Sequence, residues 1–145
     1  MNSNKKTTRI LEDVKINVKI KLTALWAAVM SCYVYGDLLG FYKTGGIEEL
    51  IAGKGAGGIQ ITQVVVLGIA ISMAIPSVMI FLSLTLKPKA NRWVNIILGI
   101  FYTVFMLGTM LMSGAWAYYI FLGIVEIVLT LLIVWYAWKW PKQEA

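Results

Sequence analysis

Residues 61–86 read ITQVVVLGIAISMAIPSVMIFLSLTL, an apolar run that contains no charged side chain. At about 1.5 Å per residue, a helix of this length exceeds the roughly 30 Å thickness of the hydrocarbon core of a bilayer. Three further, mostly apolar runs occupy about 22–42, 93–113 and 115–138. Backbone groups inside a bilayer find no water to bond, so each run is predicted to form a helix. The predicted fold is an all-α, four-helix transmembrane bundle.

The composition of the whole chain agrees with a membrane location. Of its 145 residues, 59% are hydrophobic and 14% are charged, and the mean hydropathy is +0.77. Soluble domains carry about 25% charged residues, and a soluble domain of this size could not bury so much apolar surface. These values argue against a soluble enzyme, a disordered tail and a nucleic-acid-binding module.

Reactive side chains are few. The chain has one cysteine and no histidine, which excludes an internal disulfide framework and removes the commonest metal ligand and general base. The sequence shows no pairing of a nucleophile with a base, no metal-binding cluster and no CxxC motif. We therefore expect no enzymatic activity, no metal and no cofactor.

The basic residues predict the orientation of the chain. Eleven of the thirteen flank the predicted spans on one side: Lys5, Lys6, Arg9, Lys15, Lys19, Lys21, Lys87, Lys89, Arg92, Lys139 and Lys142. Only Lys43 and Lys54 lie on the other side. The positive-inside rule then places both termini and the 87–92 turn in the cytoplasm. Contact with anionic lipid headgroups explains the net charge of +6, and no nucleic-acid partner is expected.

The chain divides into a basic cytoplasmic or interfacial segment, 1–21, a membrane domain, 22–138, and a short cytoplasmic tail, 139–145. Apolar and polar side chains alternate within 14–22, as in a strand. A lone strand has no pairing partner, so an interfacial helix that leads into the first span is favoured. The outer loop, 43–60, is rich in glycine, and its centre, 47–51, is predicted to form one or two helical turns.

A row of small residues marks the first span, where every fourth position is small: Ala24, Ala28, Cys32, Gly36 and Gly40. Small residues let helix backbones approach closely, which stabilises helix association in lipid. Packing within the bundle is the favoured interpretation, and a homodimer is the alternative. Within this row Cys32 is interpreted as a small packing residue rather than a reactive thiol.

Pro76 lies inside the second span. It removes one backbone hydrogen bond, leaves the carbonyl of Ser72 without its usual donor and is expected to kink the helix. A purely structural kink is favoured, because membrane helices tolerate proline. The alternative is a hinge, or a free carbonyl that lines a pathway.

Two carboxyl groups lie within the predicted spans, Asp37 near the outer end of the first and Glu126 deeper in the fourth. Ionisable groups cost about 2.5 kcal/mol or more in hydrocarbon and therefore usually face the bundle interior. Tyr119 and Thr130 share the helix face of Glu126. Three side chains of the other spans lie at nearly the same depth: Tyr33, Ser72 and Thr103. No basic residue lies at that depth, so a neutral, hydrogen-bonded glutamic acid is the expected resting form.

These groups leave two functions open. The favoured hypothesis is an integral membrane protein that binds or moves a small solute, a cation or a proton through a polar layer centred on Glu126. The alternative is a membrane scaffold or accessory subunit, in which the polar groups only specify helix packing. Asp37 either belongs to the polar layer or pairs near the surface with Lys43 or Lys54.

Five strings carry a resemblance to a known family: NVKIKL at 17–22, YVYGD at 33–37, AIPS at 74–77, NRW at 91–93 and WYAWKWP at 135–141. They are similar to those of a family of small, uncharacterised four-span bacterial membrane proteins. The resemblance implies a multi-pass protein of the bacterial plasma (inner) membrane. Because that family has no assigned activity, the resemblance implies no site residues.

Overall fold

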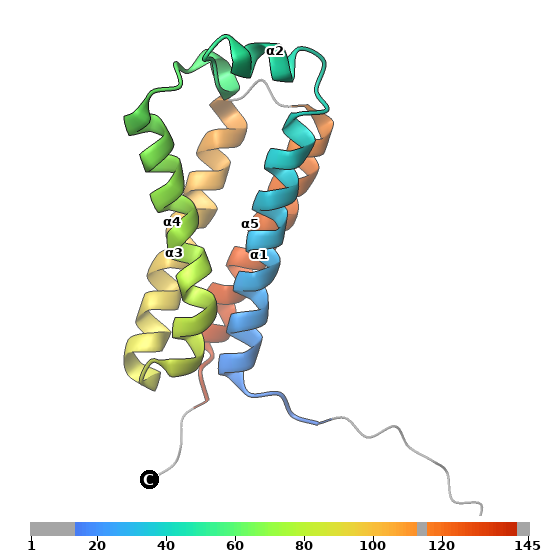
Figure 1. Ribbon diagram of the computed structural model, residues 1–145. Coiled ribbons are helices and arrows are strands. Elements are labelled where there is room, and N and C mark those ends of the chain that lie inside the picture. The colour runs from blue at the N-terminus through green and yellow to red at the C-terminus, as the bar shows by residue number, and fades with distance from the viewer. Residues whose placement is uncertain (1–13, 113–115, 142–145) are drawn as a thin grey trace, which may run out of the picture.

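The computed structural model describes residues 14–112 and 116–141, and its secondary-structure elements in these ranges are all helices (Figure 1). The helices are α1 (Val18–Gly40), α2 (Gly46–Ile51), α3 (Gln63–Thr85), α4 (Pro88–Met112) and α5 (Ala117–Trp138), with a 3-10 turn, η1, at Ala56–Gly58. Four of them, α1, α3, α4 and α5, are long and apolar enough to cross a membrane. The predicted all-α fold with four spans is confirmed.

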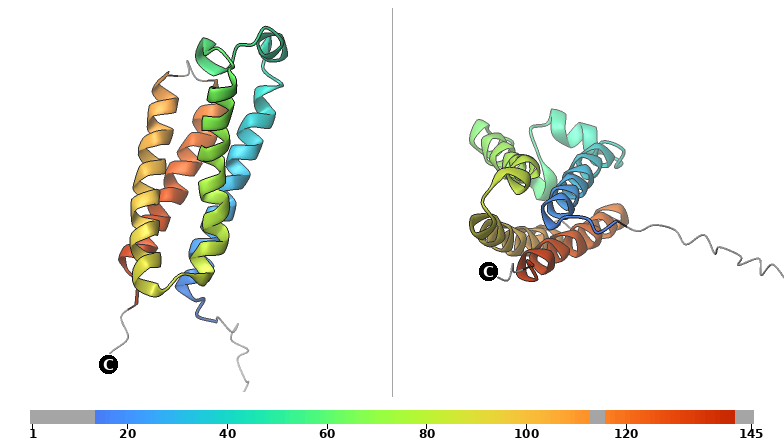
Figure 2. Two further views of the ribbon diagram at one scale, coloured as in Figure 1. Left: turned by 60° about the vertical axis from the view of Figure 1, so that its left-hand side comes forward. Right: turned by 90° about the horizontal axis from the view of Figure 1, so that it is seen from below.

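The four long helices run side by side, and α2 and η1 lie across one end of them (Figure 1). We call this end the loop end. The start of α1, the end of α5 and the turn between α3 and α4 lie at the opposite end, which we call the terminal end. Seen along the bundle, α1 packs against α3 and α5, and α5 packs against α1 and α4 (Figure 2). Helices α3 and α4 touch each other only sparsely.

The observed helix ends differ from the predicted spans most clearly at α4. This helix begins at Pro88, so most of the predicted 87–92 turn is helical and the expected start at 93 is wrong. Proline suits the first position of a helix, because its missing N–H has no partner there in any case. The basic residues that suggested a turn are instead part of the first turns of α4.

The start of α1 also corrects an expectation. Residues 14–17 are not helical, whereas residues 18–22 are the start of α1. The predicted interfacial helix is therefore absent from 14–17, and the residues before 14 lie outside the described ranges. Asn17 ends the irregular segment, because its side chain accepts a hydrogen bond of 2.9 Å from the backbone N–H of Lys19 and caps α1. In the outer loop, α2 forms over Gly46–Ile51, as the pattern at 47–51 predicted.

The terminal half of the bundle holds a polar cluster that is fully buried. Its members are Trp26 of α1, Ser83 of α3, and Asn91 and Asn95 of α4. The indole N–H of Trp26 donates to Asn95 Oδ1 over 2.7 Å. The amide of Asn95 donates to the carbonyl of Asn91, and the amide of Asn91 donates to the carbonyl of Ser83. These bonds join three helices, because a buried polar group in lipid must find a protein partner.

Lysine 19 adds a further link at the same end. Its ammonium group donates to the backbone carbonyls of Leu84 and Leu86 over 3.0 and 2.9 Å. The last carbonyls of a helix have no partner within the helix, and the helix dipole attracts a cation there. Lys19 of α1 therefore caps the end of α3.

Candidate functional site

Glu126 is a buried carboxyl of the bundle interior and the starting point of the site. Its side chain projects from the middle of α5 and is 3% exposed. One of its carboxyl oxygens, Oε2, is buried and has no hydrogen-bond partner in the described part of the chain. An oxygen atom without a partner is costly in such a place. The described chain therefore leaves one oxygen of this carboxyl without a hydrogen-bond donor.

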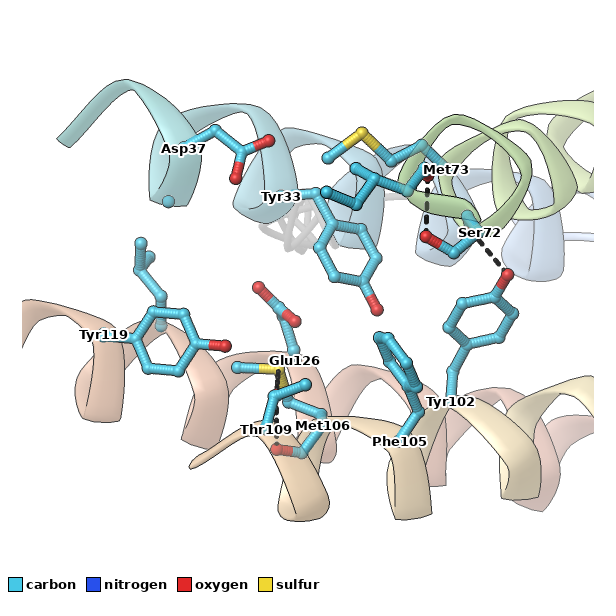
Figure 3. Close-up of a pocket in the computed structure, with 13 residues that line it drawn as sticks. Tyr33, Asp37, Ser72, Met73, Tyr102, Phe105, Met106, Thr109, Tyr119 and Glu126 are labelled. Atoms are coloured by element: carbon cyan, nitrogen blue, oxygen red, sulfur yellow. Dashed lines mark hydrogen bonds between the residues drawn. The ribbon is translucent and has the colours of Figure 1, made fainter. Parts of the chain in front are cut away.

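The carboxyl of Glu126 points into a cavity of about 220 Å³ toward α1, which carries Tyr33 and Asp37 (Figure 3). All four long helices line this cavity, which we call the Glu126 cavity. Its lining consists of Tyr33, Gly36, Asp37, Ile69, Ser72, Met73, Tyr102, Phe105, Met106, Thr109, Tyr119, Leu122 and Glu126. Two carboxyls and no basic side chain are among these residues, so the cavity is acidic.

Five of the residues that sequence reasoning selected meet in this cavity: Tyr33, Asp37, Ser72, Tyr119 and Glu126. The other two, Thr103 and Thr130, do not line it. Their hydroxyls lie 2.7 Å apart between α4 and α5, and Thr130 also donates to the carbonyl of Glu126 over 3.0 Å. They therefore join two helices one turn away from the cavity.

Pro76 explains how a residue that sequence reasoning missed enters the site. Because Pro76 has no N–H, the carbonyl of Ser72 lacks its usual donor within α3. The hydroxyl of Tyr102 on α4 donates to this carbonyl over 2.7 Å. Helix α3 continues through the proline from Gln63 to Thr85. The freed carbonyl was the signal that could have led to Tyr102, since such a group in a membrane requires a donor.

The row of small residues on α1 faces α5 near the loop end. A Cβ atom at Gly36 would lie 3.8 Å from Cδ1 of Leu122, and one at Gly40 would lie 3.7 Å from the hydroxyl of Tyr118. Ala28 and Cys32 are half-buried nearer the middle of the helix, whereas Ala24 is exposed. Gly36 and Gly40 thus pack within the bundle and bring α1 close to α5 beside the Glu126 cavity.

A second cavity, of about 410 Å³, adjoins the Glu126 cavity on the side of the loop end. It shares four lining residues with the Glu126 cavity: Gly36, Asp37, Ile69 and Tyr119. Lys43, Glu49 and Lys54 of the loop also line it, and Lys43 and Glu49 form an ion pair of 3.4 Å. Asp37 thus lies where the two cavities meet and forms no ion pair with a described residue. The two cavities are therefore neighbours, and the second lies toward the loop end.

Toward the terminal end the interior is filled. Leu22, Val29, Met79 and Ile133 are almost completely buried there, and the polar cluster around Asn95 lies in the same half. Both cavities therefore lie on the loop-end side of these buried side chains.

Four apolar helices of membrane length define the protein as a multi-pass integral membrane protein. The chain belongs to a family of unknown function, DUF6326, whose model matches residues 9–145. This match agrees with the predicted resemblance to an uncharacterised family. No curated protein and no solved structure matches the chain.

Proposed function

We propose that the protein reversibly binds a proton or a small cationic solute at Glu126 and exchanges it through the loop end of the bundle. The observation that carries this proposal is the carboxyl of Glu126, which lines a cavity and whose Oε2 atom is buried without a hydrogen-bond partner in the described chain. The acidic lining favours a cation over an anion. The second cavity, which adjoins the first at Asp37, supports exchange at the loop end.

A scaffold without transport explains the same group less well. Trp26 and Asn95, which do hold helices together, form a hydrogen bond of 2.7 Å with each other. The Oε2 atom of Glu126 is buried and has no hydrogen-bond partner within the described chain. A group that only specified packing would be expected to form one, since the unpaired state is costly.

The proposal includes the orientation of the protein in a bacterial plasma membrane. We propose that the terminal end faces the cytoplasm and its anionic headgroups, and that the loop end faces outward. Lys21, Arg92 and Lys139 support this orientation, because they lie at the terminal end over the rings of Tyr136, Trp138 and Trp135. Basic residues are typical of the cytoplasmic side, and aromatic rings are typical of both membrane interfaces.

Labelling of single cysteines in intact cells tests the orientation. In a Cys32→Ser background, Glu48→Cys on the exposed face of α2 should react with a membrane-impermeant maleimide. Gln143→Cys should react only after the membrane is permeabilised, because the positive-inside rule places the C-terminus in the cytoplasm. Labelling of Gln143→Cys from outside would reverse the proposed orientation.

Infrared spectroscopy tests the exchange of a proton at Glu126. In wild-type protein in lipid bilayers, a carboxylic-acid C=O band should grow as the pH falls and shift in deuterated water. Glu126→Gln should lose one component of this band, because an amide of similar shape cannot take up a proton, while the other carboxyl groups keep theirs. Glu48→Gln serves as the matched control, since this exposed glutamate of α2 lines neither cavity. A Glu126 band that ignored both pH and deuterated water would leave only the scaffold function.

A further inference from the structure

Resting on that proposed function, we propose that the solute of the Glu126 cavity is an organic monocation with an aromatic group. Its charged centre would lie at the Glu126 carboxyl, and its ring would pack among the aromatic side chains of α1, α4 and α5. Three properties of the cavity carry this inference: the kind of rings that line it, the sign of its charges and its size.

Aromatic rings make up much of the cavity wall: Tyr33, Tyr102, Phe105 and Tyr119. The ring of Tyr102 stands edge-on to those of Tyr33 and Phe105, with centroids 6.4 and 6.3 Å apart. The faces of such rings carry negative charge density and attract organic cations, most strongly where water is excluded. Rings from three helices thus surround the space into which the carboxyl of Glu126 points.

The bonding of Tyr102 strengthens this preference. Its hydroxyl donates its single proton to the carbonyl of Ser72. Toward a solute, Tyr102 therefore offers the ring and the lone pairs of its oxygen, both of which attract positive charge. A solute that needs a hydrogen-bond donor from this residue finds none.

The charges of the cavity exclude anions and match inorganic cations poorly. Asp37 and Glu126 line the cavity without a basic side chain among the lining residues. A hard cation such as Ca²⁺ requires six to eight oxygen ligands. No group of three or more carboxylate, histidine or cysteine side chains suited to a metal occurs in the described ranges. Rings and the thioethers of Met73 and Met106 line much of the remaining wall, and they suit a weakly hydrated organic cation.

The volume sets the size of the solute. The Glu126 cavity measures about 220 Å³, whereas an apolar protein cavity of about 150 Å³ holds one benzene molecule. The additional space fits a small ammonium group attached to the ring. A longer substituent would extend past Asp37 into the second cavity.

Calorimetric titration of the full chain in zwitterionic lipid nanodiscs with benzyltrimethylammonium tests the inference. This probe combines one ring with one permanent positive charge. Tetramethylammonium keeps the charge without the ring, and benzenesulfonate keeps the ring with the opposite charge. We expect tetramethylammonium to bind at least about tenfold more weakly than benzyltrimethylammonium, because it lacks the contacts of the ring. We expect benzenesulfonate, which has the opposite charge, not to bind.

Variants assign the binding to the cavity. Glu126→Gln should weaken benzyltrimethylammonium binding by about tenfold or more, since it removes the countercharge. Phe105→Leu keeps the apolar volume and removes a ring, and should weaken binding several-fold. Glu48→Gln removes an exposed carboxyl outside both cavities and should bind as the wild type does. Equal binding by wild type and Glu126→Gln, or equal binding of benzenesulfonate, would overturn the inference.

The pH dependence gives a further readout, because one carboxyl cannot hold a proton and a countercharged ammonium together. Binding should weaken as the pH falls. The titratable groups that face Glu126 are Tyr33 and Asp37 of α1, Tyr102 of α4 and Tyr119 of α5, while α3 contributes none to the lining. Asp37→Asn should therefore retain the pH dependence, whereas Glu126→Gln should lose it. If Asp37→Asn lost it instead, Asp37 would be the binding carboxylate and the inference would be wrong.

The outcomes separate the inference from the function on which it rests. If Glu126 exchanges protons in the infrared titration and benzyltrimethylammonium does not bind, the aromatic solute is excluded and proton binding stands. If Na⁺ or K⁺ displaces benzyltrimethylammonium at equal concentration, the site belongs to an inorganic cation and the inference also fails. If neither proton exchange nor cation binding occurs, both proposals fall.

Discussion

Gly99→Ala is expected to destabilise the bundle by about 1–3 kcal/mol, the usual cost of forcing extra atoms into a close-packed interface. A Cβ atom at Gly99 would lie 2.7 Å from Cγ2 of Val134 and 3.2 Å from the backbone oxygen of Thr130. The backbone oxygen cannot yield without moving α5, and the branched valine side chain is stiff on a helix. Unfolding by sodium dodecyl sulfate in mixed micelles, followed by circular dichroism, measures the effect.

Two further glycines provide matched comparisons for Gly99. Gly108 lies on the same helix, and a Cβ atom there meets nothing within 4 Å, so Gly108→Ala should change stability by less than about 0.5 kcal/mol. At Gly123 a Cβ atom meets only the flexible side chains of Met106 and Met110, which can adjust. Gly123→Ala should therefore fall between the other two. Equal stability of all three variants would contradict the close packing of α4 on α5.

Asn95→Leu is expected to lower stability by about 2–3 kcal/mol, because it removes several buried hydrogen bonds at once. Asn95 accepts from the indole of Trp26 and donates to both oxygens of Asn91 over 2.8 and 2.6 Å. Leucine has a similar size but leaves the indole N–H without a partner in a buried place. The same detergent titration measures this loss, and the cavity half of the bundle should keep its helices.

A double-mutant cycle separates hydrogen bonding from packing in this cluster. Trp26→Phe combined with Asn95→Leu removes both partners of the 2.7 Å bond, so the double variant should lose less stability than the sum of the single losses. Ser77→Ala is the control, since exposed Ser77 bonds only to the carbonyl of Met73 within its own helix. Simple addition of the two losses would show that Trp26 and Asn95 do not cooperate.

Hydropathy predicted the four membrane helices because hydrocarbon allows a spanning chain few alternatives. It failed at the start of α4 for a physical reason. Lys89, Asn91 and Arg92 are polar and were interpreted as part of a turn, yet Asn91 is completely buried. Asn91 and Asn95 lie four residues apart and therefore share one helix face. The spacing of these two asparagines could have indicated a buried polar cluster. Hydropathy averaged over many residues does not reveal it, because the average ignores which helix face a residue lies on.

The sequence predicted how deep the residues of the candidate site lie in the membrane, but not toward which neighbouring helix each side chain points. Counting along the helices placed Tyr33, Ser72 and Glu126 at one level, and all three line the cavity. Thr103 lies at a similar level but turns toward Thr130. The rotation of each helix about its axis depends on packing with its neighbours, and a single sequence does not supply it. Whether Tyr102, Phe105 and Met106 line the cavity depends on that rotation of α4.

The packing order of the helices bears on how the protein is made. A ribosome delivers α1 and α3 to the membrane before α4 and α5, and the interfaces within these two pairs are close, whereas α3 and α4 touch sparsely. Each pair can thus form an interface as soon as its second member has been inserted. Helix α5, which follows the other three long helices in the described chain, packs on both α1 and α4 and brings Glu126 with it. A chain that stops before α5 therefore lacks the helix that packs on both α1 and α4. It also lacks Glu126, the buried carboxyl of the cavity.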